Sequence, residues 1–126
     1  MIVVDTSALI DSLAGVRRSA PRFRSFLEAG ERLVVPALVL YEFLRGPREA
    51  EQLAAQETLL PGAAAIPFDG AVAAVAARLY RSVARPRGRE IDLAIAAHAL
   101  NLEAALWTLN TDDFRDIPGL RLVPAG

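Results

Sequence analysis

The chain opens with Met1-Ile2-Val3-Val4-Asp5-Thr6-Ser7-Ala8-Leu9-Ile10, and this stretch decides the fold. Its β-branched run, residues 2–4, is typical of a strand buried on both faces inside a parallel sheet. Thr6 and Ser7 are good helix N-caps, so a helix should follow directly. Asp5 therefore lies where a strand passes into a helix, at the edge where open α/β sheets bind ligands. Taken alone, Asp5 is more simply explained as a capping residue, and a functional role depends on further acids.

Length and composition indicate one domain over residues 1–126, rich in packed helices. Of the 126 residues 53% are hydrophobic, and much of this excess is alanine. No apolar run is long enough to span a bilayer, and no basic segment precedes an apolar one as in a signal peptide. The absence of cysteine excludes disulfides and thiolate metal sites and favours a cytoplasmic location. The net charge of −1 argues against a polybasic nucleic-acid binder, although local patches stay open.

The alternation of strand and helix patterns predicts an α/β fold with a parallel sheet and right-handed crossovers. Strands are expected at residues 2–4, 32–36, 64–67, 104–109 and 120–123. Helices are expected at residues 7–14, 19–29, 37–45, 48–60, 70–84 and 90–101, with one further turn at residues 113–116. Asp69 is expected to cap the helix at residues 70–84.

Two acids lie within apolar helices. Glu42 is the only charge in residues 37–44. Burying even a neutral polar group without a partner costs on the order of 2–7 kcal/mol, so Glu42 needs a metal, a partner such as Arg45, or water. Asp92 lies in the first turn of a helix that is apolar nearly all round. The helix dipole favours a negative charge there by roughly 0.3–1 kcal/mol, but Glu90 could serve the dipole from a more exposed position.

A further pair of acids, Asp112 and Asp113, follows the strand that ends at Leu109. Adjacent acids in a loop are more often turn formers than ligands. Thr108 and Asn110 are nearby polar groups that could orient a ligand or a water molecule. The pair therefore marks the same carboxyl edge of the sheet as Asp5, with its role left open at this point.

Two other side chains are not given a catalytic role. His98 is six residues beyond Asp92, so the two side chains point to different sides of their helix. We interpret His98 as structural or partner-facing. Ser7 has no His–Asp relay in prospect, which argues against a serine hydrolase.

Parallel topology brings these acids together. The strand ends that carry Asp5 and Asp112 or Asp113 meet at one edge, and Asp92 and Glu42 can join them from their helices. Several carboxylates in one pocket repel and raise one another's pKa, which a divalent cation relieves. Ligands that are all oxygen select Mg²⁺ or Mn²⁺. Such a site can bind a phosphodiester and activate water for in-line attack.

The chain resembles the PIN-domain ribonucleases over its whole length, and within them the VapC-type toxins of bacterial toxin–antitoxin pairs. The motifs that carry the resemblance are Val4-Asp5-Thr6-Ser7-Ala8-Leu9-Ile10, Tyr41-Glu42-Phe43-Leu44-Arg45-Gly46, Asp92-Leu93-Ala94-Ile95-Ala96-Ala97-His98-Ala99 and Thr108-Leu109-Asn110-Thr111-Asp112-Asp113-Phe114. The resemblance implies a PIN-like three-layer α/β/α domain with a central parallel sheet. Asp5, Glu42 and Asp92 match the family's three main acids, and Asp113, directly before Phe, matches the fourth.

We therefore expect an endoribonuclease, the toxin of a toxin–antitoxin pair, that depends on Mg²⁺ or Mn²⁺. Asp5 and Asp92 should hold the metal most directly, and Glu42 and Asp113 should complete the site through water or hold a second ion. Metal-bound water is then the nucleophile. The family resemblance also implies an RNA substrate, a small VapB-type antitoxin and a homodimer.

A basic loop precedes Asp92 and is expected at the rim of the pocket. Arg85, Arg87 and Arg89 could offset the acids and hold substrate phosphates, although an ordinary solvated loop explains them as well. Thr6 and Asn110 are the other candidate substrate-binding residues.

Two other classes share parts of this pattern. A receiver-type signalling domain also has an acidic Mg²⁺ pocket, but it needs a lysine at a late strand end and all 14 basic residues here are arginines. A non-catalytic RNA- or protein-binding module on the same fold is the alternative, but a phosphate-binding surface should not carry four uncompensated carboxylates.

Partner surfaces are expected on two helices. The helix at residues 37–45 is apolar on more than one face, and the helix at residues 70–84 adds an alanine-rich surface. A domain this small cannot bury every helix face, which favours a two-fold contact and a groove for the antitoxin. A basic side chain of the antitoxin could then enter the acid pocket. Helix propensity alone also explains the alanines.

Overall fold

A three-stranded parallel sheet lies at the centre of the structure, a computed structural model that describes residues 1–124. Its strands are β1 (Ile2–Val4), β2 (Leu33–Val34) and β3 (Ala105–Trp107), in the order β2-β1-β3. Ile2 of the central strand lies opposite Leu33 on one side and Ala105 on the other. All strands point the same way, so their carboxyl ends meet at one edge, as the sequence predicts.

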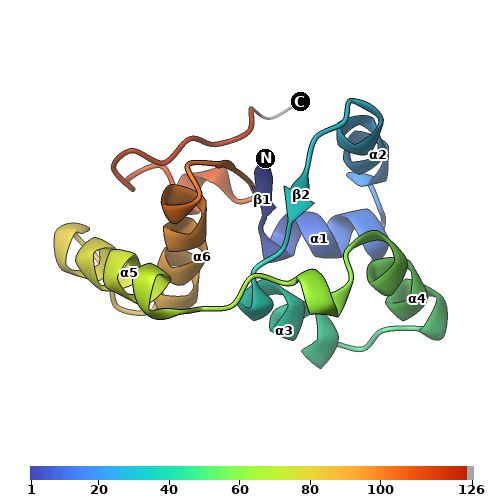
Figure 1. The fold of residues 1–126 in the computed structure, drawn as a ribbon, viewed down its shortest axis with the longest axis horizontal. Coiled ribbons are helices and arrows are strands. Elements are labelled where there is room, and N and C mark those ends of the chain that lie inside the picture. The colour runs from blue at the N-terminus through green and yellow to red at the C-terminus, as the bar shows by residue number, and fades with distance from the viewer. Residues whose placement is uncertain (125–126) are drawn as a thin grey trace.

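Helices cover both faces of this sheet, which confirms the three-layer α/β/α arrangement. They are α1 (Thr6–Leu13), α2 (Ala20–Glu28), α3 (Ala37–Arg45), α4 (Ala50–Leu59), α5 (Gly70–Ser82) and α6 (Glu90–Asn101). In Figure 1 helices α5 and α6 lie to the left of the sheet, and α1, α2 and α4 lie to the right. Within residues 1–124 none of the helices has the length and apolar character needed to cross a bilayer.

The core explains why α6 and α2 are held at the carboxyl edge of β3. Helix α6 is buried from Leu93 to Ala99, and it packs on β1, β3 and α5. On the other side of the sheet the ring of Trp107 meets the rings of Phe23 and Phe26, at centroid distances of 6.4 and 5.1 Å. Aromatic pairs of this kind stabilise by about 0.5–1.5 kcal/mol beyond their buried area. Both layers are therefore fixed close to the point where β3 ends.

Two expected strands are reduced to single parallel bridges. Residues 64–67 contribute one bridge from Ile66 to Pro36, preceded by the 3₁₀ turn η1 (Gly62–Ala64). Prolines 36 and 67 have no N–H to donate, so the ladder cannot extend there. The expected final strand is likewise one bridge, between Leu106 and Leu122.

Several helix boundaries also differ from expectation by one or two residues. Helix α4 begins at Ala50 rather than at residue 48, because Glu49 and Gln52 form a reciprocal capping box. The turn expected at residues 113–116 lies earlier, as the 3₁₀ turn η2 (Thr111–Asp113). The predicted cap of α5 is confirmed, since the Asp69 carboxylate accepts a hydrogen bond from the Val72 backbone N–H at 3.0 Å.

Candidate active site

Asp5 is fixed by the sheet itself. It directly follows β1, its backbone N–H donates to the Trp107 carbonyl at 2.9 Å, and its own carbonyl accepts from the Leu9 N–H. It occupies the N-cap position of α1, yet its side chain makes no capping hydrogen bond. The residue is only 4% exposed. The capping interpretation is therefore wrong for this carboxylate, which is directed elsewhere.

Two hydroxyl groups orient the Asp5 carboxylate. Thr108 and Ser7 both donate to Asp5 Oδ2, at 2.7 and 2.9 Å. Each hydroxyl oxygen in turn accepts a backbone N–H, from Asn110 and Leu109 respectively, at 3.0 Å. Because backbone donors occupy these oxygens, their protons are directed to Asp5. Within residues 1–124 Oδ1 receives no hydrogen bond, so it is the oxygen left for a ligand.

The Thr6 hydroxyl binds the carboxylate of Glu42 and does not cap α1. Its hydroxyl donates to Glu42 Oε1 at 2.6 Å, and Arg45 lies 3.4 Å from the other carboxylate oxygen of Glu42. The expected pairing of Glu42 with Arg45 is thus present, and Thr6 adds a tie from α3 to the start of α1. The Glu42 side chain is 19% exposed, so it is partly buried and still accessible to a ligand from solvent.

The pKa of Asp92 is affected by the charges of the other three acids. Burial raises the pKa of the Asp92 carboxyl from 3.8 to about 6. The charges of Asp5, Asp113 and Glu42, in that order of effect, contribute to the rise, and Arg89 opposes it. The structure therefore places Asp5, Glu42 and Asp113 within electrostatic reach of Asp92.

The neighbouring acid Asp112 lies apart from this group. Its side chain is 85% exposed and pairs with Arg115 at 2.8 Å. Asp113, by contrast, is among the charges that act on Asp92. Of the two adjacent acids, Asp113 is thus the one placed near the group.

Arg89 ties the start of α6 to the loop after η2. Its guanidinium donates to both carboxylate oxygens of Asp116, at 2.9 and 2.7 Å, and to the Asp113 carbonyl at 2.9 Å. Such bidentate pairs are geometrically specific as well as strong. Of the basic-loop arginines, Arg89 is thereby occupied, whereas Arg85 and Arg87 are exposed at the surface.

His98 is buried rather than partner-facing. It is 0% exposed, and neither ring nitrogen has a hydrogen-bond partner within residues 1–124. Burial lowers its pKa, with the charge of Asp69 opposing, and its ring lies 6.1 Å from that of Phe68. The structural part of the interpretation holds, because the ring is fully buried and packs against Phe68, just before α5.

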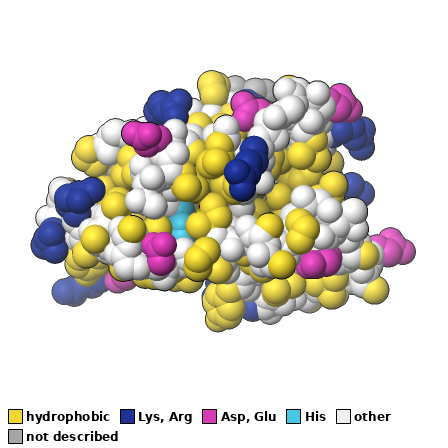
Figure 2. All heavy atoms as spheres, viewed as in Figure 1, with side chains coloured by type: hydrophobic (Ala, Val, Ile, Leu, Met, Phe, Trp, Pro, Cys, Tyr) yellow, Lys and Arg dark blue, Asp and Glu magenta, His cyan; other side chains and the backbone are white. Residues whose placement is uncertain are grey.

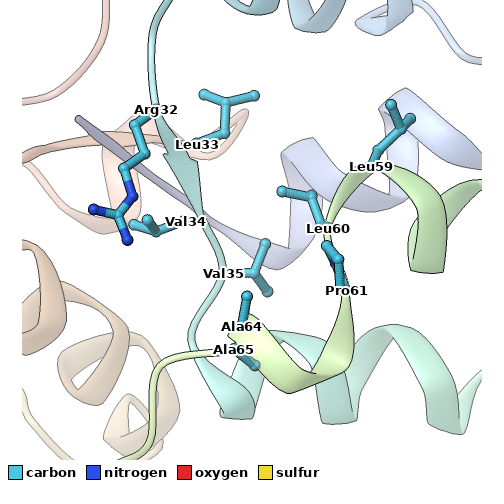
Figure 3. Close-up of a pocket in the computed structure, with 9 residues that line it drawn as sticks. All are labelled: Arg32, Leu33, Val34, Val35, Leu59, Leu60, Pro61, Ala64 and Ala65. Carbon is cyan, nitrogen blue, oxygen red and sulfur yellow. The ribbon is translucent and has the colours of Figure 1, made fainter.

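A partly open pocket elsewhere in the molecule is separate from these acids. Figure 3 shows it, about 100 Å³ in volume, between β2, the end of α4 and η1. Of the described residues that line it, Arg32 alone is charged. With no acid in its lining it does not offer the chemistry of the carboxylate group.

The donor set of the carboxylate group fits a hard divalent cation. Carboxylate oxygens held by hydroxyls suit Mg²⁺ or Mn²⁺, the chain has no cysteine, and its one histidine is the buried His98. Within residues 1–124 no three acidic or histidine side chains already stand close enough to enclose one ion. Like charges without a cation repel, so a bound ion would draw the four acids closer.

Comparison with known proteins identifies the family. Residues 2–120 match the PIN domain. This chain is a member of the PIN domain family. The PIN domain is 32% identical, over 124 residues, to the protein named Ribonuclease VapC19 of Mycobacterium tuberculosis. The match covers 96% of this chain and 98% of that protein.

Solved structures share the fold of this PIN domain. A DNA-bound VapBC from Salmonella typhimurium matches with a TM-score of 0.77 at 22% identity, over 97% of this chain and 96% of that one. A toxin–antitoxin complex from Klebsiella pneumoniae gives 0.73 at 25% identity, over 95% of each chain. VapBC-1 from nontypeable Haemophilus influenzae gives 0.70 at 25% identity, over 98% and 97%. The PIN-like fold expected from the sequence is confirmed.

Proposed function

We propose that this PIN domain is the ribonuclease toxin of a toxin–antitoxin pair, working in the cytoplasm, and that a divalent cation held by Asp5, Glu42, Asp92 and Asp113 serves its reaction. The observation that carries the proposal is the gathering of acids around Asp92. Burial first, and then the charges of Asp5, Asp113 and Glu42, raise the pKa of Asp92 to about 6. The 32% identity to a protein named a ribonuclease, over nearly the whole chain, supports the nuclease activity.

The residues of the site would have different roles toward the cation. Asp5 directly follows the central strand and Asp92 lies in the first turn of the largely buried α6, so they would hold Mg²⁺ or Mn²⁺ directly. Glu42 and Asp113 would complete its surroundings. When bound, the cation polarises the phosphodiester and makes the attacking water more acidic. Ser7 and Thr108 keep the Asp5 carboxylate in one orientation. No protein nucleophile is needed.

Substrate contacts outside the acids are proposed for the exposed part of the basic loop. Arg85 and Arg87 are exposed and precede α6, whereas Arg89 is committed to Asp116. Thr6 and Asn110 stand beside the acids, and Thr6 is already bound to Glu42. We therefore assign phosphate contacts to Arg85 and Arg87, and a supporting role to Arg89.

Substitution of each of the two adjacent acids after β3 tests the assignment of the site. Asp113→Asn should lower RNA cleavage by about 10–100-fold, the usual effect of weakening support around a metal. Asp112→Asn removes the same charge two positions before Phe and should stay within about threefold of wild type, because the Asp112 side chain faces solvent. Cleavage of a labelled RNA should stop in a chelator and return with Mg²⁺ or Mn²⁺.

Three results would contradict this assignment. Cleavage that survives chelation excludes the cation, and a larger loss in Asp112→Asn than in Asp113→Asn reverses the roles of the two acids. RNA binding with no cleavage under any of these metals would favour the non-catalytic binding module.

A partner surface is proposed on α3. Tyr41 and Leu44 are 58% and 48% exposed, and with Ala37 and Leu40 they line an open depression of about 450 Å³. Figure 2 shows hydrophobic side chains at the lower centre, where Figure 1 places α3. Exposed apolar patches of this kind mark protein interfaces. We assign the surface to a homodimer contact and to the antitoxin, whose basic side chain would enter the acid site and exclude both cation and RNA.

Light scattering on the purified chain should give the mass of a dimer at tens of micromolar, roughly where a weak interface is still populated. Leu44→Ser should shift this equilibrium towards the monomer, because it removes apolar area from α3. Val16→Ser is the matched control, since Val16 is 72% exposed in the turn after α1. A wild-type monomer at that concentration, or equal effects of the two variants, would refute the contact.

A further inference from the structure

An acid site needs positive charge beside it to hold RNA. The four carboxylates repel phosphates, and a single divalent cation offsets only part of their charge. Arginines that pair with acids are already engaged, as Arg89 is with Asp116 and Arg115 is with Asp112. Cations that reach the substrate must therefore be sought among arginines without such partners.

Such arginines line a groove that shares one wall residue, Thr108, with the surroundings of Asp5. The groove has a volume of about 210 Å³. It lies between the start of α2, which supplies Arg22 with Arg18 just before it, the segment after β3, and residues 123–124. Thr108 forms part of its wall and also donates to Asp5 at 2.7 Å. The groove and the acid site are thus neighbours that share one residue.

The charge of this groove is not neutralised within the described residues. Neither Arg18 nor Arg22 forms an ion pair inside residues 1–124. The Arg22 guanidinium lies 5.3 Å from the centroid of the Phe26 ring, which holds it in place while leaving its charge intact. The carboxylate of the adjoining helix, Asp11, accepts the Ser19 backbone N–H at 2.7 Å. No acid is among the described residues that line the groove.

We propose that this groove holds the stretch of single-stranded RNA next to the scissile phosphate, with Arg18 and Arg22 contacting its phosphates. The inference rests on the proposed function. Arginine suits phosphate because its planar fork donates two hydrogen bonds at once. Thr111 adds a hydroxyl, and Leu109, 48% exposed, offers an apolar surface at the rim. Trp107 is 2% exposed and cannot stack on a base.

The side chains of the groove would bind the sugar–phosphate backbone of the RNA and would not recognise particular bases. Phosphate contacts position a nucleic acid and carry no sequence information. The groove should therefore add salt-dependent, sequence-tolerant affinity on the β3–α2 side of the acids. The exposed Arg85 and Arg87 lie in the loop between α5 and α6, two helices on the other side of the sheet from α2 (Figure 1). An RNA strand would then pass across the acids with arginines on both sides.

Salt dependence of RNA binding tests the groove. We would measure binding of a labelled single-stranded RNA of mixed sequence by fluorescence anisotropy, in the Asp92→Asn protein so that the RNA stays intact. Each phosphate contact on a single strand contributes about 0.7 to the slope of log affinity against log salt. Adding Arg18→Gln and Arg22→Gln together should flatten this slope by about 1.4. Arg24→Gln, on the same helix but outside the groove lining, is the matched control and should leave the slope unchanged.

A second variant guards against misfolding. Arg22 packs on Phe26, whereas Arg18 is exposed, so Arg18→Gln alone should preserve the thermal melting temperature and flatten the slope by about 0.7. With Asp92 intact, the double variant should raise KM and leave kcat nearly unchanged. If the Arg18 and Arg22 variants had the same salt slope as Arg24→Gln, the proposal that the groove binds RNA would be wrong. Failure of wild type to cleave RNA with Mg²⁺ would overturn the proposed function instead, while the slopes would still decide the groove.

Discussion

Replacing Asp92 with Asn should abolish RNA cleavage and, at neutral pH, stabilise the metal-free protein. Cleavage should fall by about 10²–10³-fold or more, since a bound cation stabilises the transition state by several kcal/mol and each 1.36 kcal/mol is tenfold in rate. Asp5→Asn should lose cleavage to a similar extent. The gain in stability follows from the raised pKa of Asp92, because Asn has the shape of the carboxyl without its charge.

The sign of the pH effect follows from the direction of that shift. The folded protein holds the Asp92 proton up to about pH 6, whereas the unfolded chain releases it near 3.8. The favourable contribution of protonated Asp92 is complete below 3.8 and is lost as pH rises through about 6. Above pH 6 the buried charge opposes folding, by on the order of 1–2 kcal/mol once partial solvent screening is allowed for. Asn removes this cost, so its advantage should be seen at pH 8 and vanish below pH 4.

Urea unfolding in a chelator, at pH 4 and pH 8, measures the effect. Asp112→Asn is the control, because it removes an equal charge from an exposed side chain and should change neither stability nor cleavage appreciably. The assignment of Asp92 would be wrong if Asp92→Asn cleaved RNA near the wild-type rate. A lower stability than wild type at pH 8 would equally contradict the raised pKa.

Replacing Thr108 with Val should weaken metal binding by about 10–100-fold, the range found when groups that orient a ligand are removed. Val keeps the volume of Thr but cannot donate to Asp5 Oδ2, and the Asn110 N–H loses its acceptor. Leaving buried polar groups unpaired costs about 1–3 kcal/mol, so the free energy of unfolding should fall as well. Thr108→Ser retains the hydroxyl and should recover most of the affinity.

Calorimetric titration with Mg²⁺ or Mn²⁺ measures this affinity directly. Thr58→Val makes the same chemical change on α4, at an exposed position, and should bind the metal like wild type. If Thr108→Val bound the ion as tightly as wild type, the hydroxyl would have no role in orienting Asp5. If Thr108→Ser were as weak as Val, packing rather than hydrogen bonding would be responsible.

The gathering of the acids could be predicted because it depends on topology. A strand buried on both faces before Asp5, and a helix apolar all round after Asp92, admit few arrangements, and parallel strands place their ends at one edge. The roles of Thr6 and Ser7 could not be predicted in this way. Their sequence context favours local capping, but in the fold they donate to Glu42 and Asp5, since a buried carboxylate without donors costs more than a helix N–H that meets water.

The other surprises have the same long-range origin. Arg89 looks like one of three solvated arginines until the chain brings it to Asp116, 27 residues away. Arg18 and Arg22 line a common groove only because the fold sets the start of α2 beside the end of β3. Residues 64–67 have a strand composition, yet prolines at 36 and 67 limit them to one bridge. Local patterns carry none of these pairings, because each depends on which distant segment arrives alongside.

The backbone hydrogen bond from Asp5 to Trp107 gives the site two parts of unequal stiffness. Asp5 belongs to the same ladder as the central strand, so its amide should exchange with solvent only when the whole domain opens. Asp113 lies in a short exposed turn held through Arg89, in a segment that local opening can release at far lower free energy. Asp5 is thus held in place before any ligand arrives, whereas the turn that carries Asp113 can move. Each ligand that binds must therefore offset the conformational entropy lost when this turn is ordered.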